Sequence, residues 1–255
     1  MDSHNEDVIS EFTRQASTSH DTSRHFNDYG LNLMIRFSKP TIYDTVLDVA
    51  CGNGTVAFEY AKFVNHVTGI DITPAMIERA RIIQKESNLD NLDWRIGDIS
   101  TLPFKDDCFS IVVTRGSLHH LIDFNKVIDE MYRVCKPGGK ILITDVTVDK
   151  NKKDEFNSVE KMRVLSYTKA LTLEDMLKKM KALGAINIQS EQFDSKRNLK
   201  AILQSSLVKP SRKNENILLL KPDIDMNNLG TKSQAVDDHV HHSLTMSTVM
   251  GIKEK

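Results

Sequence analysis

Residues 45–146 alternate between short apolar runs and longer amphipathic segments, and this pattern constrains the fold more than any other feature of the chain. The apolar runs are rich in β-branched residues, as buried strands are, and the segments between them include runs with helical spacing of apolar residues. Five strands are therefore predicted, at residues 45–50, 66–72, 92–99, 109–116 and 140–148. Such alternation produces right-handed crossovers and a parallel, doubly wound sheet.

The flanking segments complete the predicted fold. Residues 30–39 (GLNLMIRFSK) indicate an amphipathic helix, which is either a cap on the edge of the domain or a lid over a site. The sequence also predicts a helix over residues 123–135 that the KPGG turn ends, helices at 152–169 and 171–185, strands at 186–193 and 242–253, and helix and loop at 197–230. The fold class is therefore α/β: a Rossmann-like doubly wound sheet, mostly parallel with an antiparallel C-terminal edge strand, plus an N-terminal helical cap and a C-terminal helical insertion.

Charge and cysteine content exclude several classes of protein. The 255 residues carry a formal net charge of −1, which gives no indication of binding to nucleic acid or an anionic membrane. The acidic, polar start (MDSHNEDVIS) does not resemble a signal peptide, and no apolar run is long enough to span a membrane. Three scattered cysteines predict neither a disulfide scaffold nor a zinc site, and they fit the reducing cytoplasm.

The first predicted strand leads into a glycine loop, within VLDVACGNGTVAFEYAKF (residues 46–63). Gly52 and Gly54 allow a tight turn and a close approach of the backbone to a ligand, and the N–H groups that open the next helix face the same corner. Together with Ala57 they satisfy a G-x-G-x-x-A dinucleotide pattern, and Asp71 has the position of an acid that binds a ribose diol. A nicotinamide or flavin enzyme is therefore one interpretation of the loop.

Acidic residues at three predicted strand ends favour a different ligand. Asp48 lies before the loop, where a carboxylate would repel a diphosphate but would suit a cofactor that carries an ammonium group. Asp98 ends the third strand and could accept a hydrogen bond from an adenine amino group. Taken singly, Asp48 could be a buried acid bonded to backbone amides, Asp71 an acid at a helix start, and Asp98 a loop residue. Together with Arg115 they lie near the carboxyl ends of the strands, where open parallel sheets bind ligands.

These residues resemble a known family. The motifs VLDVACGNG, VTGIDITPAMIERAR and NLDWRIGDISTLPFKDDCFSIVVTRGSLHHLIDFNKVIDEMYRVCKPGGKILITD are similar to those of class I S-adenosylmethionine-dependent methyltransferases. More narrowly, the chain resembles the branch related to the ubiquinone/menaquinone biosynthesis methyltransferases. A looser similarity continues in DEFNSVEKMRVLSYTKALTLEDM and reaches back to FTRQAS near the N-terminus.

The resemblance implies a set of cofactor-binding residues. Asp48 and the backbone of Gly52, Asn53 and Gly54 would lie against the methionine part of S-adenosylmethionine, and Arg115 would meet its carboxylate. The other expected contacts are Asp71 with the ribose hydroxyls, and Ile72, Met76, Asp98 and Ile99 with the adenine. Phe12 and Gln15 would lie over the cofactor. The resemblance also implies a single methyltransferase domain over residues 1–255, with residues 1–40 as the N-terminal cap, 41–150 as the cofactor-binding core and 151–255 as the acceptor-side half with the last strands.

The catalytic group stays open at this stage. His119 and His120 in GSLHHL are candidates for a general base, and the alternative is that they stabilise a turn. Cys51 is interpreted as a small residue that fits the loop rather than as a nucleophile. The stretch DDHVHH (residues 237–242) matches no standard metal-ligand spacing and is expected to be an exposed loop, with a metal site or a part of the substrate pocket as the alternatives.

The acceptor is expected to be a small molecule. After the fourth strand the chain reads TRGSLHHL, without the Asn/Asp-Pro-Pro-aromatic signature of many nucleic-acid and amide methyltransferases. The absence of vicinal cysteines disfavours an arsenic-type acceptor. Whether carbon, oxygen or nitrogen is methylated stays open, as does the oligomeric state. A nicotinamide-dependent oxidoreductase and a non-catalytic S-adenosylmethionine-binding protein are the competing hypotheses.

Overall fold

The computed structural model describes residues 3–18, 28–198, 234–236 and 239–255, with the backbone alone at 196–198, 234–236 and 239–242. The strands are β1 (Thr45–Val49), β2 (His66–Asp71), β3 (Leu92–Ile96), β4 (Phe109–Arg115), β5 (Cys135–Val146), β6 (Ile186–Asn198), β7 (Gln234–Val236) and β8 (His239–Ile252). The helices are α1 (Ser3–Thr18), α2 (Tyr29–Ser38), α3 (Thr55–Ala61), α4 (Pro74–Ser87), α5 (Phe124–Val134), α6 (Lys153–Arg163) and α7 (Leu173–Ala182), with short 3₁₀ turns η2 (Leu118–His120) and η3 (Lys150–Lys152).

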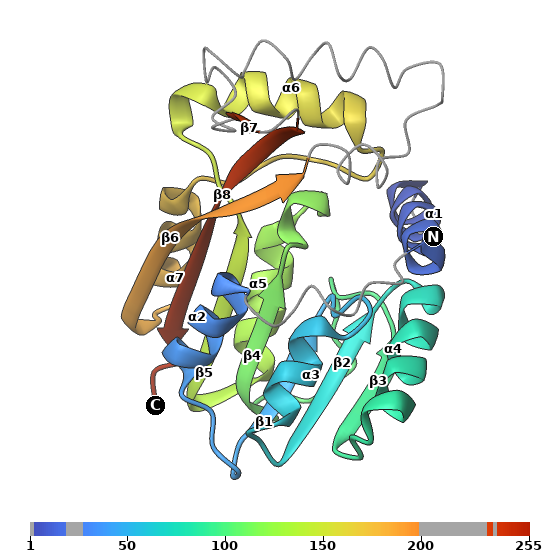
Figure 1. Ribbon diagram of the computed structural model, residues 1–255. Helices are drawn as coiled ribbons and strands as arrows, with labels where there is room; N and C mark the ends of the chain where they lie inside the picture. Colours follow the sequence, from blue (N-terminus) through green and yellow to red (C-terminus); the bar gives the residue numbers. More distant parts are fainter. Residues whose placement is uncertain (1–2, 19–27, 199–233, 237–238) are drawn as a thin grey trace.

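The described strands form one sheet in the order β3-β2-β1-β4-β5-β8-β6, with β7 paired to β8 (Figure 1). Strands β1 to β5 are parallel to one another, and β8 runs antiparallel to both β5 and β6. The order reverses between β1 and β4, which are adjacent although β2 and β3 separate them in the chain. The predicted doubly wound, mostly parallel sheet is therefore confirmed.

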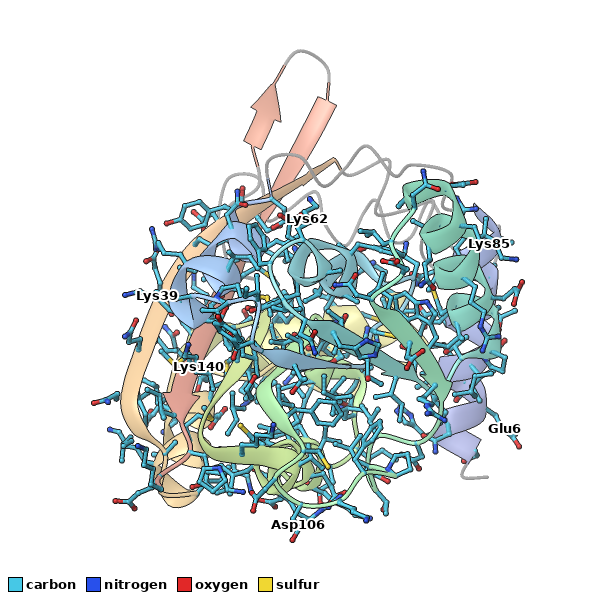
Figure 2. The ribbon with its side chains drawn as sticks, turned by 90° about the horizontal axis from the view of Figure 1, so that it is seen from below. Glu6, Lys39, Lys62, Lys85, Asp106 and Lys140 are labelled. Carbon is cyan, nitrogen blue, oxygen red and sulfur yellow. The ribbon has the colours of Figure 1, made fainter. Side chains whose placement is uncertain are left out.

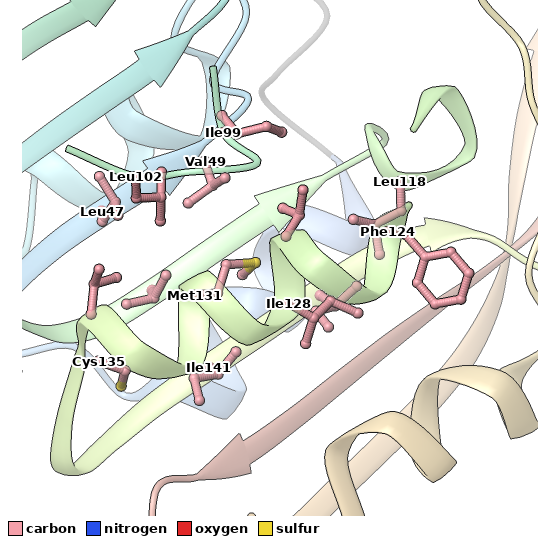
Figure 3. Close-up of a cluster of buried hydrophobic side chains, with 14 of the residues drawn as sticks. Leu47, Val49, Ile99, Leu102, Leu118, Phe124, Ile128, Met131, Cys135 and Ile141 are labelled. Carbon is pink, nitrogen blue, oxygen red and sulfur yellow. The ribbon is translucent and has the colours of Figure 1, made fainter. Parts of the chain in front are cut away.

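Helices cover both faces of the sheet and bury two apolar layers. On one face, α5 packs on β4 and β5, and α7 packs on β8 and β6; Ile128, Met131 and Met176 are fully buried there. Figure 3 shows Ile128 and Met131 of α5 in this layer. On the other face, α2, α3 and α4 contribute Met34, Tyr60 and a further set of buried side chains. Because β1, β4 and β5 lie between the two layers, each has a run of buried residues that is mostly apolar, as strands buried on both faces have.

Local sequence signals explain where several helices begin. In α5, Val127, Ile128, Met131 and Val134 form the buried face that their helical spacing predicts, and the side chain of Asp123 caps the first turn. In α7, Thr172 and Asp175 form a capping box, in which each side chain accepts a hydrogen bond from the other residue's backbone N–H. These caps satisfy backbone donors that would otherwise lack a partner.

A smaller apolar cluster lies beyond the carboxyl end of the sheet. It joins Phe156 of α6 to Tyr167 in the following segment and to Met246 of β8. In Figure 1 α6 lies across the top of the sheet, and α1 stands beside α4 at the other side of the same end. The N-terminal helix and the C-terminal half therefore both reach the edge at which β1 and β4 end.

Three predicted details differ in the structure. The antiparallel strand β8 lies second from the edge, and the outermost strand is β6, whose polar, largely exposed residues suit an edge better than the buried apolar residues of β8. The KPGG stretch follows the end of α5 as predicted but belongs to β5, where the register with β4 shifts. Helix α6 ends at Arg163, before the predicted limit, because Ser166 and Thr168 bond to Glu11 and His119 instead.

The amino end of the sheet and the rim of the molecule are polar. Figure 2, which views the molecule from below, shows labelled charged side chains such as Lys62, Lys85 and Asp106 around its periphery. No helix in the described part of the chain is long and apolar enough to cross a membrane. Most of the predicted helix and loop at 197–230 lies outside the described residues.

Candidate active site

The candidate site lies at the carboxyl edge of the sheet, where β1 and β4 end side by side. Val49 pairs with Thr114 at this edge, and the hydroxyl of Thr114 donates to the backbone carbonyl of Val49 over 2.7 Å. The order of the strands reverses here, and open parallel sheets generally bind ligands in the crevice at such a reversal. The site residues predicted on the first four strands all lie along this edge or in the segments that follow it.

The loop after β1 is built from left-handed residues. The φ angles of Ala50, Gly52 and Gly54 are 57°, 54° and 89°, and Gly54 is the N-cap of α3. A side-chain carbon on Gly54 would come within 2.5 Å of Trp94, so this glycine allows α3 to pack closely on β3. A carbon on Gly52 would meet no atom within 4 Å. The two glycines therefore have different tasks, since Gly54 packs the loop and Gly52 borders open space.

Asp71 fastens this loop to the end of β2. Its carboxylate accepts hydrogen bonds of 2.8 Å from the backbone N–H groups of Gly52 and Thr73. Burial raises the pKa of Asp71, and these two hydrogen bonds act in the opposite direction. The side chain predicted to bind a ribose thus also orients the glycine loop, and its remaining lone pairs can accept further donors.

Asp48 lies beneath the loop and is 1% exposed. One of its carboxylate oxygens accepts a hydrogen bond of 3.0 Å from the backbone N–H of Ala57 in α3. The pKa of Asp48 is raised to about 8, chiefly by burial; the charge of Asp71 acts in the same direction, and the hydrogen bond from Ala57 and the charge of Arg115 act in the opposite one. Asp48 is thus a buried acid bonded to a backbone amide, which was one of its two interpretations. A cation placed beside its carboxylate would favour the ionised form.

The residues predicted for the adenine lie around the ends of β2 and β3. The exposed Asp98 accepts a hydrogen bond of 2.8 Å from the N–H of Ser100, and Gly97 donates to the carbonyl of Asp71 over 3.0 Å. Ile99 and Met76 are each 7% exposed, and Figure 3 shows Ile99 beside Val49 at the margin of the apolar cluster. Ile72 is half-buried. The predicted adenine residues are thus adjacent, and two of them also belong to the packed interior.

Arg115 ends β4 and forms an ion pair with Asp28, which is also the N-cap of α2. Both side chains are about one-fifth exposed, at 21% and 22%. Arg115 was predicted to meet the carboxylate of the cofactor, and in this structure it pairs with the carboxylate of Asp28. A guanidinium has five donors and can hold two carboxylates, so the ion pair leaves a second contact available.

The two adjacent histidines of η2 have different surroundings. His119 Nδ1 lies 2.5 Å from the carboxylate of Asp145, which is fully buried at the end of β5. His120 Nδ1 lies 2.8 Å from the hydroxyl of Ser166, which donates to the buried carboxylate of Glu11 over 2.7 Å. Burial, reinforced by the neighbouring His119, lowers the pKa of His120 well below its ordinary value. His120 therefore belongs to a packed network between α1, η2 and the segment after α6.

Helix α1 reaches the same region. Phe12 packs edge-on against the ring of His120, with 5.1 Å between centroids, and Gln15 donates to Glu11 over 3.3 Å. Glu11, Ser166 and Asp145 were not among the predicted site residues. The sequence offers no signal for the contact between Glu11 and Ser166, because these residues lie far apart in the chain and meet only in the folded state.

Two remaining predictions concern cysteine and metal. Cys51 is buried in the loop, and burial raises the pKa of its thiol well above the ordinary value, which disfavours a nucleophilic role. In the described part of the chain no group of acidic, histidine and cysteine side chains is arranged to hold a metal ion. Asp237 and Asp238 lie outside the described residues, and the histidine side chains that follow them are not described.

Comparison with known proteins identifies the family. A family model described as "Methyltransferase domain" matches residues 43–216, which include the glycine loop and all three acidic strand ends. The chain belongs to this methyltransferase family. The "Uncharacterized methyltransferase YcgJ" of Bacillus subtilis is 30% identical over 190 residues, which are 74% of each chain. A "Demethylmenaquinone methyltransferase" of Listeria welshimeri is 35% identical over 117 residues, or 45% of this chain and 48% of the relative. The predicted resemblance to the menaquinone-related branch is confirmed.

Solved structures of methyltransferases share the fold. The crystal structure of YcgJ superposes with a TM-score of 0.81 at 23% identity and covers 89% of this chain and 99% of that one. The phosphoethanolamine N-methyltransferase 2 of Haemonchus contortus, in complex with S-adenosyl-L-methionine, has a TM-score of 0.59 at 21% identity, over 98% of this chain and 57% of that one. The family match and the curated relatives, rather than these structures, make this protein an S-adenosylmethionine-dependent methyltransferase, and the competing oxidoreductase hypothesis is not supported.

Proposed function

We propose that this methyltransferase holds S-adenosylmethionine along the ends of β1, β2 and β3 and transfers its methyl group to a small-molecule acceptor bound between this edge and the C-terminal half. The observation that supports this proposal most is the edge itself. Asp48, Asp71 and Asp98 follow one another on neighbouring strands, beside a glycine loop with open space at Gly52. This donor set fits an adenosyl group linked to an amino acid better than a diphosphate, which three acids would repel.

Each part of the proposed site has a distinct task. Asp71 would accept hydrogen bonds from the ribose hydroxyls while it holds the loop through Gly52. Asp98, Ile99, Ile72 and Met76 would enclose the adenine between one polar side chain and three apolar ones. Asp48, the backbone of Gly52, Asn53 and Gly54, and Arg115 would surround the amino-acid end.

Asp48 would complement the ammonium group of the cofactor electrostatically. In the present structure burial favours its protonated form, with a pKa raised to about 8. A positive charge nearby would stabilise the ionised carboxylate, because opposite charges lower the pKa of an acid. Binding would then release a proton at neutral pH. Arg115 would at the same time share its donors between Asp28 and the carboxylate of the ligand.

For methyl transfer the protein mainly has to align the two reactants and exclude water from them. S-adenosylmethionine supplies a methyl carbon that a positive sulfur already activates for displacement. The side chains of this chain bind and orient the two reactants, and orientation can contribute about 7–11 kcal/mol at best. The half-buried surroundings of Arg115 and the apolar cluster around Phe156 and Tyr167 would limit access of water to the crevice.

The acceptor half supports a small molecule as substrate. The part of the chain beyond residue 150 contributes α6, the segment around Tyr167 and the upper part of β8 to the edge of the sheet. We assign residues 1–255 to one domain, with 1–40 as cap, 41–150 as cofactor core and 151–255 as acceptor side. The net charge of −1 disfavours nucleic acid as acceptor, and the free thiols of Cys51, Cys108 and Cys135 fit the cytoplasm as location.

A screen with a metabolite extract tests this function. The protein is incubated with S-adenosylmethionine carrying a deuterated methyl group, and mass spectrometry follows the formation of S-adenosylhomocysteine and of labelled products. We expect one or a few metabolites to gain the label in proportion to the S-adenosylhomocysteine formed. Binding of S-adenosylmethionine without any labelled product, in extracts from several growth conditions, would contradict the proposed transfer to a small molecule.

A further inference from the structure

Within the described part of the chain, the rings of the two histidines of η2 each make one hydrogen bond through Nδ1, but the partner of His120 is a hydroxyl and that of His119 is a fully buried carboxylate. The ring of His120 bonds to Ser166, and its backbone carbonyl lies 2.7 Å from His4 Nε2. His119 bonds to Asp145 through Nδ1, whereas its Nε2 makes no hydrogen bond within the described part of the chain. The side chain of His119 is 16% exposed and that of Asp145 is 0% exposed.

The position of Asp145 fixes the tautomer of His119. One oxygen of this carboxylate accepts a hydrogen bond of 2.7 Å from the backbone N–H of Leu118, and the other accepts one of 2.7 Å from that of Val146. Both oxygens therefore act as acceptors. A carboxylate in this role requires Nδ1 to carry a proton. The neutral ring then presents the lone pair of Nε2, which is the arrangement that a general base needs.

The ring is also held in a fixed orientation beside the proposed crevice. The backbone carbonyl of His119 accepts hydrogen bonds of 2.9 Å from both the N–H and the hydroxyl of Thr168. Its ring stacks beside that of His120 at 4.1 Å between centroids and lies 6.0 Å from that of Tyr167. Since η2 begins three residues after the end of β4, these contacts place the imidazole at the carboxyl end of the sheet, beside the segment that follows α6.

From this geometry we propose that His119, oriented by Asp145, is the general base that removes a proton from the acceptor, and that the acceptor is therefore a hydroxyl, an ammonium or amine, or an acidic C–H compound. This inference rests on the proposed function and names the class of substrate. As the bond from the acceptor to hydrogen breaks, a bond from hydrogen to Nε2 forms. The acceptor's electron pair forms the bond to the methyl carbon while the carbon–sulfur bond breaks. The products are the methylated acceptor, S-adenosylhomocysteine and an imidazolium that later releases its proton to water.

Asp145 is a positioning residue in this scheme, because it contacts His119 and not the reactants. His66 provides a matched control, since it also pairs with a carboxylate, that of Asp93, over 3.2 Å. This second pair lies at the start of β2, at the opposite end of the sheet. His66→Asn removes an imidazole of the same kind without touching the proposed site.

The first readout needs no acceptor. In protein labelled with ¹⁵N-histidine and saturated with S-adenosylhomocysteine, NMR assigns the ring nitrogens of His119 by comparison with His119→Asn. We expect a proton on Nδ1 and none on Nε2 in the neutral ring, and Asp145→Asn should change this tautomer. A proton on Nε2 in the wild-type protein would overturn the inference.

The second readout compares acceptors that need a base with one that does not. Phenol and catechol have to lose a proton, and a primary amine, which is an ammonium ion at neutral pH, has to lose one before its lone pair can attack. Iodide has no proton to lose and yields methyl iodide. We expect His119→Asn to lower the rate with any methylated protic probe by about 10²- to 10⁴-fold and to leave the rate with iodide unchanged. His66→Asn should match the wild type with every probe. Thermal denaturation confirms that each variant is folded.

The outcomes separate this inference from the function on which it rests. If a protic probe is methylated equally well by the wild type and His119→Asn, the base is assigned wrongly although the enzyme is a methyltransferase. Methylation of iodide but of no protic probe also contradicts the inference. If protein that binds S-adenosylmethionine methylates no probe at all, including iodide, the proposed function fails and the inference fails with it.

Discussion

At the scale of single residues, the proposed site depends on carboxylates whose protonation the fold controls. Asp48 and Asp71 are both buried, and each accepts at least one backbone N–H at the glycine loop. Their hydrogen bonds support the loop, and the same groups are those predicted to bind a ligand. Structure and binding therefore depend on the same atoms, and substitutions must be chosen so that the two effects can be distinguished.

The raised pKa of Asp48 predicts a pH-dependent stability. Folding raises this pKa from 3.8 to about 8, so the folded state binds more protons over that interval. Its contribution to stability is fully present below the unfolded pKa and is lost as the pH rises toward 8, by up to about 1.4 kcal/mol per pH unit. Asp48→Asn keeps an oxygen for the N–H of Ala57 but does not titrate. Urea unfolding at several pH values should therefore show the variant becoming progressively more stable relative to the wild type as the pH rises.

Other groups titrate over the same range, so the relevant quantity is the difference between the two proteins. Parallel stability curves for the wild type and Asp48→Asn from pH 4 to 8 would show that Asp48 is already ionised in the folded protein. The proposed release of a proton on binding would then have no source.

Asp71→Ala is predicted to weaken binding of S-adenosylhomocysteine. The substitution removes the proposed partner of the ribose and also the acceptor for Gly52 and Thr73. Since hydrogen bonds to charged groups contribute about 1.5–3 kcal/mol each, we expect the dissociation constant to rise by at least about tenfold. Equilibrium dialysis measures it, with the exposed Asp90→Ala as a control of equal charge change. An unchanged dissociation constant would place the ribose elsewhere.

The residues of this edge could be predicted from the sequence because strand ends and glycine loops have local signatures. Asp48, Asp71, Asp98 and Arg115 were all found along one edge, as expected. The partners of these residues could not be predicted in the same way. The ion pair of Arg115 with Asp28 and the contact of His119 with Asp145 join segments whose proximity depends on the completed fold.

At the scale of elements, the glycine loop and the start of α3 are the parts most sensitive to small changes. Gly54 and Gly52 both have positive φ angles, but only Gly54 lies against other side chains, those of Trp94 and Phe58. The loop therefore offers one glycine whose replacement should affect folding and another whose replacement should affect binding.

Alanine substitutions distinguish these two tasks. Gly52→Ala should cost only about 1–2 kcal/mol of stability for its left-handed backbone but should weaken S-adenosylhomocysteine binding at least tenfold, because the new methyl group enters the open space. Gly54→Ala should cost about 1–3 kcal/mol more in stability, since its methyl group would overlap Trp94. Thermal unfolding and calorimetric titration measure the two effects.

Gly184→Ala, at the end of α7, controls for the backbone cost. Its φ is 76°, and the nearest atom to an added carbon is the hydroxyl of Tyr132 at 3.8 Å. This variant should lose a similar amount of stability to Gly52→Ala and bind normally. Normal binding by Gly52→Ala as well would mean that the open space is not part of the cofactor site.

The ends and the buried faces of helices could be predicted from the sequence where a capping residue or a helical spacing of apolar residues was present. The capping box at Thr172 and the buried face of α5 are examples. The end of α6 did not follow, because the groups of Ser166 and Thr168 find partners in α1 and η2 rather than in a continued helix. Such tertiary contacts override a local preference for helix.

At the scale of the whole molecule, the alternation of strands and helices was sufficient to predict the doubly wound sheet. The position of β8 as the inner neighbour of the edge strand β6 could not be predicted, because pairing between strands that lie far apart in the chain leaves no local pattern. The acceptor side is the least predictable part for a related reason. It is assembled from α1, η2, the segment after α6 and the upper part of β8, and no single stretch of sequence carries its pattern.

The central claim is that one edge of this sheet binds S-adenosylmethionine through its three acids and its glycine loop. A crystal structure of the complex with S-adenosylhomocysteine tests it most directly. The account predicts the ribose hydroxyls on the carboxylate of Asp71, the adenine beside Asp98 and Ile99, and the amino-acid end between the glycine loop and Arg115. An S-adenosylhomocysteine molecule bound away from the ends of β1, β2 and β3, with Asp71 in contact with Gly52 and Thr73 alone, would contradict it.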